Sequence, residues 1–145
     1  MLEVIADSSK RPTVVNDVVG LIDSEVASKG GFSGMAIKGA YKLVKKLKGG
    51  TMIADVASGL LDEFSGAIEP LHEEYRNGSG GGFDTFLRGR SNDAVNALLA
   101  ITDGRAARTS HSKLKGAYSK LRPMAEKNVA DALPGLGRLI DKHCS

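Results

Sequence analysis

Cysteine, aromatic residues and long apolar runs are all scarce in this sequence. Cys144 is the only cysteine, so the chain cannot form an internal disulfide and lacks the cysteine framework of small secreted domains. Tryptophan is absent and aromatic residues make up only 5% of the chain, so the core must consist mainly of Ala, Val, Leu and Ile. No apolar run approaches the ~20 residues of a membrane-spanning helix, and Val4-Ile5-Ala6 is too short for a signal peptide. These scarcities predict a cytoplasmic protein with no membrane span.

Residue groupings that carry catalysis or bind metals are missing as well. The three histidines and the single cysteine show no spacing typical of a structural zinc site. The glycine-rich stretches contain no G-x-x-x-x-G-K-S/T phosphate loop. His111 stands between two serines, where a helix N-cap at Ser110 or Ser112 is a simpler interpretation than a catalytic triad. We therefore expect no catalytic residue, no metal and no cofactor, which weighs against an enzyme.

Apolar residues recur at helical spacing along most of the chain, and the alternation typical of strands is absent. The 145 residues, 41% of them hydrophobic, are enough for one globular domain with a core of its own. Three helices are expected in the first half: one from near Pro12 to Gly30-Gly31, one over about 33–48, and one from after Thr51 that Pro70 bends or interrupts. The expected N-caps are serines: Ser8 or Ser9, Ser91, and Ser110 or Ser112.

The second half of the chain repeats the order of the first. The tetrapeptide KGAY occurs at 38–41 and again at 115–118, and IADVASGL (53–60) aligns with VADALPGL (129–136). Length differences between the copies fall between helices, where insertions are tolerated. We therefore predict an all-α fold of six to seven helices, in which two pseudo-symmetric three-helix repeats form one compact bundle. The predicted parts are copy one at about 12–76, a Gly-rich linker at 77–82, a short helix at 83–88, and copy two at about 91–142.

The two KGAY helices share a basic face. Lys38, Lys42 and Lys45 follow i, i+4, i+7 spacing, and residues 105–122 carry six basic residues and no acidic one. Mid-helix Gly39 and Gly116 suggest that another helix approaches the backbone closely. The lysines are either a solvated helix face or part of an anion-binding surface for nucleic acid or an acidic membrane. The candidate anion-binding residues are Lys38, Lys42, Lys45, Arg105, Arg108, Lys115 and Arg122.

Three functional hypotheses follow from these patterns. The first is a non-enzymatic helical module that acts through protein–protein contact, including self-association. The second is the anion binder described above, although its basic segments lack interleaved aromatic residues for base stacking. The third is a small-ligand carrier with a pocket between the copies, lined by Tyr41 and Tyr118, for which core packing of the two tyrosines is the simpler explanation.

The segments SKRP (9–12), the two KGAY helices and ALPGLGRLIDKH (132–143) together resemble a family of small bacterial proteins known only as a domain of unknown function. The resemblance covers nearly the whole chain. It implies a bacterial, cytosolic, all-helical protein and carries no catalytic residue or partner with it.

Overall fold

A computed structural model describes residue 4, residues 6–78 and residues 80–144 of the chain. Helices occupy almost all of these residues and no strand occurs among them, which confirms the predicted all-α class. The α-helices are α2 (Arg11–Ser28), α3 (Gly31–Lys45), α4 (Met52–Arg76), α5 (Phe83–Gly89), α6 (Ser91–Arg108), α7 (Ser112–Leu121) and α8 (Ala125–Cys144), with 3-10 turns η1 (Leu47–Gly50) and η2 (Arg122–Met124).

Helix ends differ from the expectation in their caps. Residue 10 precedes α2 without a side-chain cap, and the hydroxyl of Ser9 instead binds Asp7. Ser91 is the first residue of α6 rather than its cap. At α7 the cap is His111, whose Nδ1 accepts a long hydrogen bond of 3.5 Å from the Leu114 amide. The predicted serine caps are therefore wrong, because Lys10, Arg90 and His111 hold the N-cap positions of these three helices.

Two further expectations about helix continuity need correction. α4 runs through Pro70 as one helix of 25 residues, so Pro70 does not interrupt it, and the alternative of a bend there stays a prediction. α3 ends at Lys45, three residues earlier than predicted, and the chain turns through positive φ angles at Lys48 and Gly49 before α4 begins. Positive φ is a common way to stop a helix and redirect the chain.

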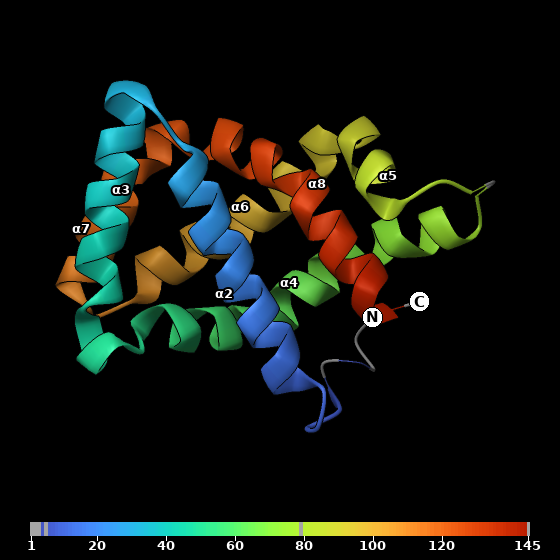
Figure 1. The fold of residues 1–145 in the computed structure, drawn as a ribbon, viewed down its shortest axis with the longest axis horizontal. Helices are drawn as coiled ribbons and strands as arrows, with labels where there is room; N and C mark the ends of the chain where they lie inside the picture. Colours follow the sequence, from blue (N-terminus) through green and yellow to red (C-terminus); the bar gives the residue numbers. More distant parts are fainter. Residues whose placement is uncertain (1–3, 5, 79, 145) are drawn as a thin grey trace.

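The helices pack as two connected groups (Figure 1). α4 and α8 are central, because α2 and α6 each pack against both of them, whereas α3 packs against α7. The larger core cluster lies between α4, α5, α6 and α8 and contains the fully buried Phe83, Leu87 and Leu133. A smaller cluster joins α3, α7 and the start of α4. None of the helices in the described parts is long and apolar enough to cross a membrane.

Helix α5 lies along α8 at an unusually close distance. A Cβ atom on Gly137 would lie 2.4 Å from the Cα of Asp84, so only glycine fits at this crossing. Asp141 Oδ2 accepts a 3.0 Å hydrogen bond from the Phe83 amide and thereby caps the first turn of α5 from the neighbouring helix. This pairing joins the start of α5 to the C-terminal half of α8.

The proposed repeats contribute unequally to the core. Val95, Leu98 and Leu99 of α6 are buried, whereas the aligned Val15 and Val18 of α2 are only partly buried. The difference arises because α5, which has no counterpart in the first half, joins the core beside α6 and α8. The internal duplication and its boundaries therefore stay a prediction.

Candidate anion-binding surface

Helices α3 and α7 lie side by side at the end of the molecule opposite α5 (Figure 1). They pack through apolar residues, since Ala40, Val44 and Ala117 form the buried contact together with Met52 at the start of α4. The two helices come from segments without any acidic residue, which extend over 26–54 and 104–125. Their pairing therefore brings two stretches of one charge sign into contact.

Six lysines on these helices have exposed side chains and no ion pair with another described residue. Like charges that are not neutralised locally produce a positive potential over the surface between them. We name this set the cationic surface: Lys38, Lys42 and Lys46 from α3 and its C-cap, and Lys113, Lys115 and Lys120 from α7.

Three members of the cationic surface are in the predicted anion-binding set, and three are not. Lys38, Lys42 and Lys115 were expected from the i, i+4 pattern of the KGAY helices. Lys46 and the α7 residues Lys113 and Lys120 are additions, because the predicted set followed the i, i+4, i+7 positions that the two KGAY helices share. The signal that finds them is the absence of acidic residues over the two whole segments.

The other predicted cations are mostly engaged elsewhere. Arg122 makes two bonds to Asp103, Nε at 2.8 Å and Nη2 at 3.1 Å, and Lys45 pairs with Asp23 at 3.4 Å. Arg108 is exposed near the end of α6 and has no ion pair among the described residues.

Arg105 is directed toward α4. Its Nη2 donates to the Gly59 carbonyl at 2.6 Å and to Glu63 at 2.9 Å. Because Arg105, Lys45 and Arg122 each have a carboxylate partner, they are weak candidates for an external anion.

Both KGAY tyrosines bind a carboxylate on the preceding helix. The Tyr118 hydroxyl donates to Asp103 at 2.6 Å and lies 2.7 Å from the Thr102 hydroxyl, and the Tyr41 hydroxyl donates to Asp23. Hydrogen bonds from Arg122 and then Tyr118 lower the pKa of Asp103. Burial, followed by the bond to Asp23, raises the pKa of Tyr41. These clusters hold α3 against α2 and α7 against α6.

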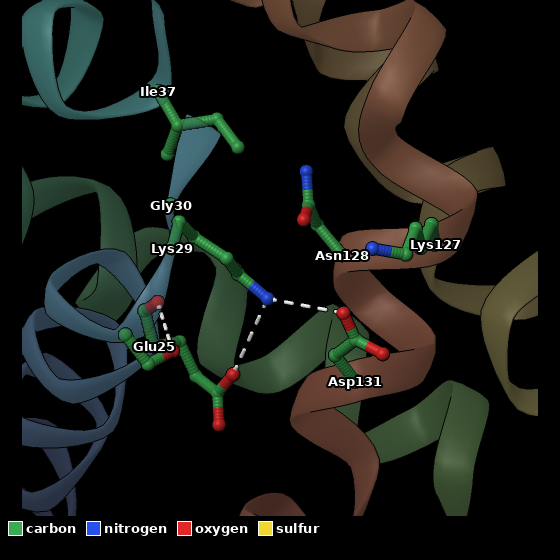
Figure 2. A pocket seen from close by; sticks show the side chains of 8 residues that line it. Glu25, Lys29, Gly30, Ile37, Lys127, Asn128 and Asp131 are labelled. Carbon is green, nitrogen blue, oxygen red and sulfur yellow. Dashed lines mark hydrogen bonds and ion pairs between the residues drawn. The ribbon is translucent and has the colours of Figure 1, made fainter. Parts of the chain in front are cut away.

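The tyrosines do not line the pocket shown in Figure 2. This pocket of about 370 Å³ lies between the α2–α3 junction and α8. Lys29 Nζ is 3.2 Å from Asp131 and 3.7 Å from Glu25 there, so the charges of the pocket largely neutralise one another. The carrier hypothesis gains no support from this pocket, because its lining is mostly polar and neither Tyr41 nor Tyr118 belongs to it.

The expected close helix approach at the KGAY glycines is wrong. A Cβ atom on Gly39 or on Gly116 would meet no neighbouring atom within 4 Å, and both residues are exposed. The close approaches occur instead at Gly137 against α5 and at Gly135, where a Cβ would lie 2.5 Å from Leu21 Cδ1. Both KGAY glycines therefore lie on the solvent side of their helices.

Within the described part of the chain, no three His, Cys, Asp or Glu side chains gather as a metal site would require. His72 is buried beside Phe83, with ring centroids 4.9 Å apart, and burial lowers its pKa. His143 Nε2 lies 2.6 Å from Asp17 Oδ2. These two histidines are therefore part of the packing between helices.

Comparison with protein-family models matches residues 1–144 to one family, which is described as a family of unknown function, DUF6918. No curated protein and no solved structure gives a significant match to the chain.

Proposed function

Because the chain belongs to DUF6918, a family of unknown function, we propose a role from its own surfaces: it binds polyanions through the cationic surface. The observation that carries this proposal is the packing of α3 against α7. It joins two segments that together hold twelve basic residues and no acidic one.

Charge distribution elsewhere in the chain makes this end distinctive. The first 77 residues contain nine basic and eleven acidic residues, yet residues 26–54 within them contain no acid. The acidic residues of the first half are concentrated in α4, where Asp62 and Glu63 each pair with an arginine from another helix. An ordinary solvated helix face carries charges of both signs, so a face with one sign favours binding of an anion.

The ion pairs around the cationic surface support its role in a second way. Asp23 and Asp103 are engaged by Lys45, Arg122 and the two KGAY tyrosines. These carboxylates are therefore already partly neutralised. They belong to α2 and α6 and not to the two helices that carry the cationic surface. At physiological salt, charges farther than about 8 Å are largely screened, so local lysines dominate what an approaching polyanion meets.

Retention on immobilised heparin tests the proposal. We expect the wild-type chain to be retained at low salt and eluted steeply as salt rises, because each engaged cation releases a counterion. The variant Lys42→Glu/Lys120→Glu should elute at much lower salt. The control variant Lys10→Glu/Arg88→Glu makes the same change in net charge at exposed positions outside α3 and α7.

The control decides between a local surface and net charge alone. We expect Lys10→Glu/Arg88→Glu to elute close to the wild type. Equal losses in both variants, or no retention of the wild type at low salt, would contradict the proposal. The protein-interaction hypothesis stays a prediction beside it, and light scattering of the same samples reports self-association directly.

A further inference from the structure

Two large apolar side chains are left exposed on the same helix as the unpaired lysines. Met35 retains 70% and Leu43 48% of their accessible surface, and both belong to α3. Among the described residues, they are the large hydrophobic side chains that are exposed rather than buried or partly buried. Exposed apolar residues that coincide with a charged patch indicate a binding surface more strongly than scattered ones do.

These residues share one stripe with two members of the cationic surface. Residues 35, 39, 42, 43 and 46 follow i, i+4, i+7, i+8, i+11 spacing, which places them on one side of a helix. All five positions are exposed, whereas Ile37, Ala40 and Val44 on the other side are buried. We name Met35, Gly39, Lys42, Leu43 and Lys46 the outer stripe of α3.

The outer stripe is accessible to a flat surface. Gly39, at its centre, has open space where a side chain would be. The neighbouring α7 carries the exposed Lys113, Lys115 and Lys120, and its exposed Gly116 and Ser119 are small. The two helices thus form one end layer of the molecule, as Figure 1 shows.

We propose that this layer docks on an anionic lipid bilayer, with the lysines on lipid phosphates and Met35 and Leu43 in the headgroup–acyl boundary. The inference rests on the proposed function and names its ligand. A lipid surface uses both features of the stripe, because it offers anionic groups and an apolar layer within reach of a helix lying flat. A nucleic acid would engage the lysines and leave the apolar pair in water.

The aromatic side chains of these helices do not favour a nucleic acid. Stacking on unpaired bases requires accessible aromatic faces. Tyr41 and Tyr118 are partly buried, and their hydroxyls are bound to Asp23 and Asp103. Two apolar side chains are too few to hold the protein on a bilayer, so docking also requires attraction between the lysines and anionic lipids. Binding should therefore depend on anionic lipid and on salt.

Co-sedimentation with vesicles tests the inference. We expect the wild-type chain to partition onto vesicles of equal phosphatidylglycerol and phosphatidylcholine and not onto phosphatidylcholine alone. Met35→Ser/Leu43→Ser should weaken partitioning by about tenfold or more, because it removes the apolar contribution. Met35→Leu/Leu43→Met keeps the apolar character and should bind as the wild type does. Retention on heparin should be unchanged in both variants.

The outcomes separate this inference from the proposed function. Heparin retention without binding to anionic vesicles would overturn lipid docking while the polyanion proposal stands. Vesicle binding that is unaffected by Met35→Ser/Leu43→Ser would overturn the role of the stripe. A wild-type dimer that this variant dissociates, without vesicle binding, would assign the stripe to a second copy of the chain and also overturn the inference. If the wild-type chain is not retained on heparin at low salt, both proposals are refuted together.

Discussion

Single residues in the KGAY helices determine how stable the end layer is. Gly39 and Gly116 are exposed positions inside helices, with open space around the position of a Cβ. Glycine costs roughly 1 kcal/mol relative to alanine in a helix interior. We therefore expect Gly39→Ala and Gly116→Ala each to raise the free energy of unfolding by about 1 kcal/mol. Urea unfolding of the two variants and the wild type measures this change in the free energy of unfolding.

The matched control for these substitutions is Gly137→Ala. Its new Cβ would lie 2.4 Å from the Cα of Asp84, so α5 and α8 would have to separate. We expect this variant to be less stable than the wild type. A loss of stability in Gly39→Ala would show that another group approaches that face of α3 after all.

Asp103 should make stability depend on pH. Its pKa is lowered from the ordinary 3.8 by hydrogen bonds from Arg122 and then Tyr118. A carboxyl with a lowered folded-state pKa stabilises the fold above its unfolded pKa, and this contribution is lost as the pH falls through the folded value. Asp103→Asn should therefore be less stable than the wild type at pH 7, with the difference shrinking below about pH 4. Urea unfolding at pH 7 and pH 3 checks this.

A double-mutant cycle with Asp103→Asn and Arg122→Gln tests whether Arg122 is the partner through which Asp103 stabilises the fold. We expect the coupling between Asp103 and Arg122 at pH 7 to be favourable and to decrease at pH 3. A difference between wild type and Asp103→Asn that stays constant over this range would rule out the carboxylate as the source.

At the scale of elements, the short helix α5 depends on α8 for its first turn. α5 has seven residues and no side-chain cap of its own, and Asp141 accepts a hydrogen bond from the Phe83 amide. Loss of a helix cap costs about 1 kcal/mol. We expect Asp141→Ala to lower the free energy of unfolding by about that amount. Asp141→Asn keeps an acceptor oxygen and should lose less. Equal stability of Asp141→Ala and the wild type would contradict the assigned cap.

Helices were predictable from the sequence to different degrees in their interiors and at their ends. Apolar periodicity indicated the segments that became α2, α4 and α6, because burying a stripe requires that spacing in any all-helical fold. The caps and the end of α3 were not predictable, since His111 and Asp141 act through positions that pattern alone does not distinguish. Gly137 looked like any other glycine, because its role depends on a helix that meets it only after folding.

At the scale of the whole molecule, the sequence predicted a basic face but not which cations remain available. Lys45 and Arg122 fit the KGAY pattern as well as Lys42 does, yet Asp23 and Asp103 neutralise them. These carboxylates lie 22 and 19 residues away from their partners in the chain. Which cations can bind an external anion therefore depends on the tertiary structure, that is, on how α2 and α6 pack beside α3 and α7.

The two Asp–Tyr–cation clusters bear on the predicted duplication. Asp23, Tyr41 and Lys45 correspond in order and chemistry to Asp103, Tyr118 and Arg122, and each set joins the first helix of its copy to the second. This correspondence supports the duplication as a proposal. α6 is more deeply buried than α2, so the two predicted copies differ in the part of the core that α5 joins.

The central claim is that α3 and α7 bind a polyanion as one surface. The most direct test is the salt dependence of the affinity for a fluorescent heparin oligosaccharide, compared between the wild type, Lys38→Gln/Lys42→Gln, Lys115→Gln/Lys120→Gln and Lys10→Gln/Arg88→Gln. The slope of log Kd against log salt counts the cations engaged, on the order of one unit for each. The account predicts a smaller slope for both the α3 and the α7 variant and an unchanged slope for the Lys10/Arg88 variant. Equal slopes in all four proteins would contradict it.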